Sequence, residues 1–230
     1  SLFLVTVAAT GQEGFDFGMD LGLGAQTFQT ADGPVTYQSL SLDPDIAFGK
    51  IGIGLDLTLN YRFVAPDPGA GETQSSIEIR KEDWVPSGDI SFLDLYLPKF
   101  KYVRWGFKGD PLYVKFGSIE NGTLGNGFIM GRYANTLFLP DRRFFGISFD
   151  LDGKLFDFPY VGLETHAGNL AALDVVGARI FTRPLIWLDL PIIKNLEVGA
   201  SYVTDRQPDY FLTNGTELDP ISIIGADFFQ

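Results

Sequence analysis

The sequence predicts an all-β fold, and three observations support this prediction. Apolar and small polar residues alternate over long stretches, Gly is abundant at 27 of 230 residues, and Pro-containing turns separate the alternating stretches. Successive side chains of a strand point to opposite faces, so strict alternation indicates a strand with two chemically different faces. No stretch of comparable length shows an apolar period of 3.6 residues, and helix is therefore expected only as a minor element.

The alternating stretches divide the chain into an even number of strands. The clearest are "FDFGMDLGLGAQT" (15–27), "IGIGLDLTLNYRF" (51–63), "FGISFDLD" (145–152) and "LEVGASY" (196–202), with weaker ones at 101–108, 111–117, 159–166 and 171–182 and a last one at 219–229. With a further strand within 127–138, short turns at 49–50, 98–99, 152–159 and 183–195 alternate along the chain with polar loops at 29–34, 64–88, 109–110, 139–143, 167–170 and 205–219. This alternation gives roughly twelve strands, with shorter turns at one end and longer loops at the other. This arrangement predicts consecutive antiparallel strands in an up-and-down order.

The two faces of these strands differ in a way that favours a membrane barrel. The polar positions hold mainly Gly, Asp, Ser and Thr, which are small enough for the crowded interior of a narrow barrel. The apolar positions are bulky and end in aromatic residues such as Tyr61, Phe63 and Tyr202, as a lipid-facing band with an interfacial girdle would. The longest strands, of about 13 residues, exceed the roughly 9–11 residues that a tilted crossing needs. The predicted fold is an antiparallel transmembrane β-barrel.

The predicted barrel domain covers residues 13–230. Residues 1–12 are expected to be either a signal-peptide remnant, with Val7 and Ala9 near a cleavage site, or a first strand. The alternative fold is a soluble secreted β-sandwich, in which the same apolar parity would form the core. Gly on the polar parity and the length of the strands favour the barrel.

Composition excludes several functional classes. The 17 basic and 29 acidic residues give a net charge of −12, which argues against binding to nucleic acid. The chain has no Cys and one His, so a metal site with His or Cys ligands is not expected. No Ca²⁺-binding loop or nucleophile elbow is present, and "GTLGNG" (122–127) is expected to be a turn. We expect no catalysis and no cofactor.

Charged residues on the polar parity are the candidate functional residues. Those expected to line a pore are Asp16, Asp20, Asp56, Arg62, Arg104, Lys115, Arg132, Asp150, Asp152 and Glu197. Arg132 belongs to the cluster 131–145, which is expected either to form a charged constriction or to flank a strand and pair with carboxylates. Glu164 and His166 share a strand face and are either an acid/base pair or, as we favour, a polar pair near a strand end.

In these features the chain resembles bacterial outer-membrane β-barrel proteins. The stretch "YVRWGFKGDPLYVKFGSIENGTLGNGFIMGRYAN" (102–135) is similar to a segment of uncharacterised outer-membrane-type proteins of spirochaetes and other two-membrane bacteria. Many barrels of this kind end on an aromatic residue, whereas this chain ends Phe228-Phe229-Gln230 and lacks an initiator Met. The chain is therefore expected to be either a whole barrel or part of a larger one.

The resemblance implies a location in the outer membrane and contact with its lipid bilayer. The expected function is a narrow pore or transporter for small polar solutes, or a structural barrel exposed at the surface. The alternative is a soluble secreted all-β binding module. Other subunits of a membrane complex are further expected partners, and the sequence leaves the oligomeric state open.

Overall fold

β-Strands are the main regular secondary structure of the fold. The computed structural model describes residues 4–10, 14–30, 33–66, 69, 74–86, 92–137, 143–188, 193–209 and 218–229. Its strands are β1 (Leu4–Thr10), β2 (Phe15–Thr30), β3 (Gly33–Phe48), β4 (Ile51–Leu55), β5 (Leu57–Val64), β6 (Ser76–Ile79), β7 (Phe100–Trp105), β8 (Leu112–Gly117), β9 (Gly146–Asp152), β10 (Val161–Ala167), β11 (Val175–Thr182), β12 (Glu197–Asp205) and β13 (Ile221–Phe229). Helix is limited to α1 (Phe92–Tyr96) and to the short 3₁₀ turns η2 (Lys81–Asp83), η3 (Leu97–Lys99) and η4 (Gly153–Phe156) among these residues.

The all-β prediction and the antiparallel order are confirmed. Each alternating stretch contains a strand, and the paired neighbours are antiparallel. Only Asp56 separates β4 from β5, so the described strands form about twelve continuous runs. Residues 1–12 include strand β1.

The strand predicted within 127–138 is wrong. Gly127 and Arg132 have φ angles of +81° and +56°, which lie in the left-handed region and interrupt an extended backbone. The segment instead turns back on itself, with an isolated bridge between Gly122 and Tyr133. Residues 138–142, which include part of the predicted charge cluster, lie outside the described residues.

The chain divides into two compact units. Unit 1 comprises residues 1–49 and 53–101, and unit 2 comprises residues 50–52 and 102–230. In unit 1, β2 and β3 form a hairpin paired from Phe15 opposite Phe48 to Thr30 opposite Gly33. β1 pairs with β2, β5 pairs with β3, and β6 pairs with β5.

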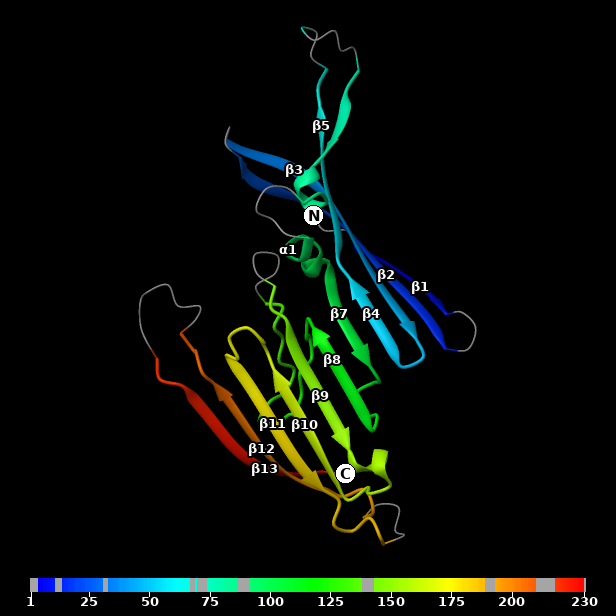
Figure 1. Ribbon diagram of the computed structural model, residues 1–230, viewed down its shortest axis with the longest axis vertical. Helices are drawn as coiled ribbons and strands as arrows, with labels where there is room; N and C mark the ends of the chain where they lie inside the picture. Colours follow the sequence, from blue (N-terminus) through cyan, green and yellow to red (C-terminus); the bar gives the residue numbers. More distant parts are fainter. Residues whose placement is uncertain are drawn as a thin grey trace. The chain divides into compact units, whose positions relative to one another are not determined.

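Unit 2 carries the candidate site and is an open sheet in the order β7-β8-β9-β10-β11-β12-β13, whose later strands lie side by side in Figure 1. Short turns join β7 to β8 and β9 to β10. Gly106, in the first of these, has a φ of +72°, and a Cβ there would lie 2.3 Å from the carbonyl oxygen of Leu112. Among the described residues β13 pairs only with β12, so the sheet does not close into the predicted barrel.

The two faces of this sheet differ in exposure, and the polar face is the buried one. On the polar face Arg179 is 0% exposed and Ser201 is 2% exposed. On the apolar face Ile180 is 65% exposed and Ile224 is 79% exposed, and no described segment covers these side chains. A globular sheet in water normally buries its apolar face. Unit 2 has the opposite arrangement.

Exposed aromatic side chains gather at the end of unit 2 where the short turns lie. They are Trp105, Phe107, Phe156, Phe158, Tyr160 and Trp187. The turns that carry them follow β7, β9 and β11, three strands that run in the same direction because each is separated from the next by one antiparallel strand. These aromatic residues therefore mark one rim of the sheet.

Candidate functional site

Strand register brings charged residues of unit 2 into lateral rows on the buried face. Asp150 of β9 lies opposite Glu164 of β10, which lies opposite Arg179 of β11. One row along, Asp152 and Asp227 lie at the two ends of a row that also contains Gly162, Phe181 and Gly199. Directly opposite residues share a face of the sheet, so the register alone concentrates these charges in one place.

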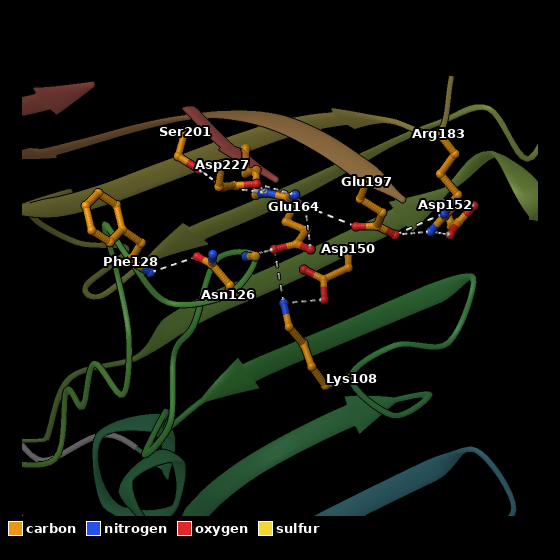
Figure 2. A network of polar contacts seen from close by, with 12 residues as sticks. Lys108, Asn126, Phe128, Asp150, Asp152, Glu164, Arg183, Glu197, Ser201 and Asp227 are labelled. Carbon is orange, nitrogen blue, oxygen red and sulfur yellow. Dashed lines mark hydrogen bonds and ion pairs between the residues drawn. The ribbon is translucent and has the colours of Figure 1, made fainter. Parts of the chain in front are cut away.

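Arg179 is the centre of the resulting network, which Figure 2 shows from close by. Its Nη2 donates a hydrogen bond to Asp227 Oδ1 at 2.7 Å, and its Nη1 lies 3.4 Å from Glu164 Oε1 and 3.6 Å from Glu197 Oε2. The guanidinium also lies 4.9 Å from the ring centroid of Phe181. A side chain that is completely buried thus has three carboxylate partners from three other strands.

Glycine makes room for this arginine. A Cβ on Gly199 would lie 2.6 Å from Arg179 Nη2, and a Cβ on Gly125 would lie 2.5 Å from Arg179 Nε. Contacts that short do not occur between real side chains, so any larger residue would displace the guanidinium. The abundance of Gly on the polar parity therefore has a local cause in unit 2: the neighbouring side chains are large and charged.

Arg183 forms a second ion-pair centre just beyond the end of β11. Its Nη2 donates to Asp152 Oδ2 at 2.7 Å and to Glu197 Oε1 at 2.5 Å. Burial opposes the charge, but the hydrogen bonds to the two carboxylates outweigh it and raise the pKa of Arg183 above its ordinary value. Glu197 has contacts with both arginines, so it links the two centres.

Lys108 is the third cation, and it differs from the arginines. It lies in the turn between β7 and β8, and its Nζ is 2.8 Å from Asp150 Oδ2 and 3.6 Å from Glu164 Oε2. Its side chain is 46% exposed, whereas those of Arg179 and Arg183 are 0% and 8% exposed. Several hydrogen bonds fix the two arginine side chains, whereas the ammonium of Lys108 lies at the end of a flexible alkyl side chain.

The segment 118–137 lies on this face. The N–H of Gly125 donates a 2.7 Å hydrogen bond to Glu164 Oε2, and Leu124 and Met130 are buried beside Gly177. The Asn135 amide holds the base of the segment, since its Nδ2 donates to the carbonyl oxygens of Gly117, Phe144 and Gly168 and its Oδ1 accepts from the N–H of Ile119.

Tyr133 of the same segment packs edge-on against His166, with 4.9 Å between the ring centroids. Burial, with smaller contributions from the charges of Asp174 and Asp205, raises the pKa of Tyr133 to about 12. The phenol therefore stays neutral over the whole physiological range.

Two cavities remain beside the segment. One, of about 360 Å³, is lined by the carboxylates of Asp110, Asp150, Asp152, Glu164 and Glu197 and by the cations Lys108, Lys154 and Arg183. The other, of about 380 Å³, is lined by Lys108, Lys115, Asp150, His166 and part of the segment 119–125. Lys108, Gly125 and Asp150 line both cavities. Each volume suits a few water molecules or a small solute.

The structure brings some of the predicted pore-lining residues together. Asp150, Asp152 and Glu197 belong to the charge network, and Lys115 lines one cavity beside Asp150. Arg104 donates to the carbonyl oxygen of Gly106 at the turn end.

The other predicted residues lie elsewhere. Arg132 is exposed within the segment 118–137. Asp16, Asp20, Asp56 and Arg62 belong to unit 1, where Asp16 is exposed and Arg62 forms an exposed ion pair with Glu78.

Sequence reasoning missed Lys108, Arg179, Arg183 and Asp227 as site residues and treated Glu164 only with His166. In the structure Glu164 contacts the cations, whereas His166 Nδ1 is 3.0 Å from Ser148 Oγ, so the two do not share a partner. The alternation of Gly177, Arg179 and Phe181 places Arg179 on the polar parity, and that signal was available. Its partners lie 15 to 48 residues away and depend on register.

None of the helical segments in the described part of the chain has the length and apolar character that a membrane-spanning helix requires. Within the same part, no three His, Asp or Glu side chains are grouped so as to hold a metal ion. Comparison with protein-family models, with curated proteins and with solved structures gives no match.

Proposed function

We propose that this chain is a β-barrel of a bacterial outer membrane, with its apolar face toward lipid and its charged face toward an interior that admits small polar solutes. The observation that carries the proposal is the reversed burial of unit 2, in which Arg179 is 0% exposed and Ile180, the next residue, is 65% exposed. In lipid an exposed apolar face is favourable, and a polar face belongs inside.

Two further observations support the proposal. The exposed aromatic residues at the turn end, such as Trp105, Phe156 and Trp187, match the aromatic belt that strands carry where they enter the interface. The segment 118–137 lies against the polar face, where Leu124 and Met130 lie beside Gly177, and cavities of about 360 and 380 Å³ remain beside it. The proposed route is therefore narrow and suits small solutes.

The proposal implies that further pairing closes the open sheet. An open edge leaves unpaired backbone N–H and C=O groups, which lipid cannot satisfy. In the described part of the chain β13 pairs along one edge, with β12, so its other edge is where the closing strand would have to pair.

Single-cysteine labelling tests the proposal, since the chain has no native Cys. Ile180→Cys and Ile224→Cys each place a fluorophore on the apolar face, and Lys115→Cys places one beside the 380 Å³ cavity. After reconstitution, spin-labelled lipid should quench the first two labels and aqueous iodide the third.

A soluble sandwich would give a different result. The protein would then stay monodisperse without detergent and would not enter the outer-membrane fraction, and spin-labelled lipid would quench none of the labels. That outcome would overturn the membrane proposal. The exposed apolar face would then be expected to pack against another layer of protein.

A further inference from the structure

We infer that Asp150 and Glu164 form a binding site for a small organic cation, and that Lys108 occupies this site as a tethered, displaceable cation. Asp150 and Glu164 lie directly opposite each other on β9 and β10. Like charges in that position destabilise a sheet unless a cation lies between them. The ammonium of Lys108 is that cation, 2.8 Å from Asp150 and 3.6 Å from Glu164.

A second, independent observation points to a ligand. Asp150 is only 8% exposed, and its Oδ1 has no hydrogen-bond partner among the described residues. Asp150 lines both cavities, so this carboxylate meets the space on either side of Lys108. A buried carboxylate oxygen without a donor retains the capacity to accept a hydrogen bond from an entering N–H group.

The three cations of the network differ in how easily they can leave. Arg179 and Arg183 are buried and make multiple hydrogen bonds, so they remain with their carboxylates. The side chain of Lys108 is nearly half exposed, and its neighbours Phe107 and Gly109 in the turn are exposed as well. When its ammonium swings away, Asp150 loses the cation that lay 2.8 Å from its Oδ2, whereas Glu164 keeps Arg179, whose Nη1 lies 3.4 Å from Oε1.

The chemistry of the vacated site selects a primary amine. The tethered group is an ammonium on an alkyl stem, and Leu151, Leu163 and Phe181 line the same cavity as apolar neighbours for such a stem. Five carboxylates and three cations line that cavity, so anions are disfavoured. If the protein transports solutes, this site implies that they are small cations, and that part of the inference rests on the proposed pore. Binding of a cation at the site can be tested without measuring conduction.

The decisive experiment is chemical rescue of Lys108→Ala in detergent solution. Thermal unfolding of the wild type, of Lys108→Ala and of the double variant Lys108→Ala/Asp150→Asn is followed against increasing n-butylammonium chloride, with equimolar NaCl and with butan-1-ol as controls. The first reagent reproduces the lysine side chain, and butan-1-ol has the same alkyl chain without the charge.

The expected result is a saturable rise in the Tm of Lys108→Ala, by roughly 3–6 °C at ten times the Kd of the amine. The wild type, whose site is filled, and the double variant, which lacks one carboxylate, should show no such rise. An absent rise in Lys108→Ala, or an equal rise in all three proteins, would overturn the inference. Lys108→Gln repeats the test with a longer neutral side chain if the alanine variant folds poorly.

Planar-bilayer recordings separate this inference from the proposed function. If the protein forms a channel, Lys108→Ala should increase its permeability to K⁺ over Cl⁻, and Lys81→Met, an exposed lysine of unit 1, should leave it unchanged. Rescue by butylammonium without any channel activity would support the cation site and reject the pore. Channel activity without rescue would reject the cation site and leave the pore intact.

Discussion

Replacing Arg179 by Met should destabilise unit 2 more than any other single charge deletion in the network. The substitution keeps an unbranched side chain of similar length, so the loss is mainly that of the charge. Among the described residues it leaves Asp227, whose side chain is 5% exposed, with a single hydrogen-bond contact, at 3.5 Å from Ser201 Oγ. It also removes a partner from Glu164 and Glu197. Removing one partner of a buried ion pair costs about 3–5 kcal/mol.

Lys154→Met is the matched control. Lys154 Nζ lies 3.8 Å from Asp152 Oδ2, but its side chain is 51% exposed. Water and salt screen such a pair, and its loss should change the free energy of unfolding by about 0–1 kcal/mol. Both variants remove one cation at the same charged face, so the difference between them isolates burial.

The free energy of unfolding is measured by urea titration of the reconstituted protein in a Trp84→Phe background, so that the fluorescence signal comes from Trp105 and Trp187 of unit 2. The double variant Arg179→Met/Asp227→Asn should be more stable than Arg179→Met, because it removes the stranded carboxylate charge. If Arg179→Met and Lys154→Met differed by less than about 1 kcal/mol, the description of Arg179 as a buried ion-pair centre would be wrong.

The remaining predictions concern packing, the segment 118–137 and pH. Gly199→Val should cost about 1–3 kcal/mol in the same urea assay, because its Cβ would meet Arg179, whereas Gly24→Val, with no atom within 4 Å, should stay within about 0.5 kcal/mol. Asn135→Ala should cost about 1–3 kcal/mol, because it leaves buried backbone groups unpaired, and limited proteolysis should then cleave the segment 118–137 first. Tyr133, whose folded pKa is about 12 against about 10 when unfolded, stabilises the fold fully below pH 10 and loses this contribution between pH 10 and 12. The stability difference between the wild type and Tyr133→Phe should therefore change over that interval, and an unchanged difference would contradict the burial of the phenol.

The positions of the strands were predictable, because they depend on local alternation. The stretches "FGISFDLD" and "LEVGASY" alternate with a period of two residues over eight and seven residues, and they contain β9 and most of β12. The segment 118–137 was not predictable in the same way. Its backbone reverses at residues such as Gly127 and Arg132, and Arg132 has a left-handed φ that its side chain does not signal.

The charge network was only half predictable. Asp150, Asp152 and Glu197 stand in clearly alternating strands, so their parity identified their face. Arg183 follows the end of a strand and reads as part of a Pro-containing turn, and Lys108 lies in a turn as well. Which carboxylate each cation contacts depends on strand register and turn geometry. Neither can be predicted from the residues of a single strand.

The buried charges have a consequence for how the sheet avoids misalignment. A slip of one residue between neighbouring strands would exchange the two faces, and the contrast between Arg179 and Ile180 penalises it strongly. A slip of two residues keeps every apolar side chain on its own face, so alternation alone cannot detect it. Such a slip would, however, separate Arg179 from Asp227 and Arg183 from Glu197. The hydrophobic pattern thus rejects odd misalignments and the ion pairs reject even ones, and together they leave one alignment of strands β9 to β13.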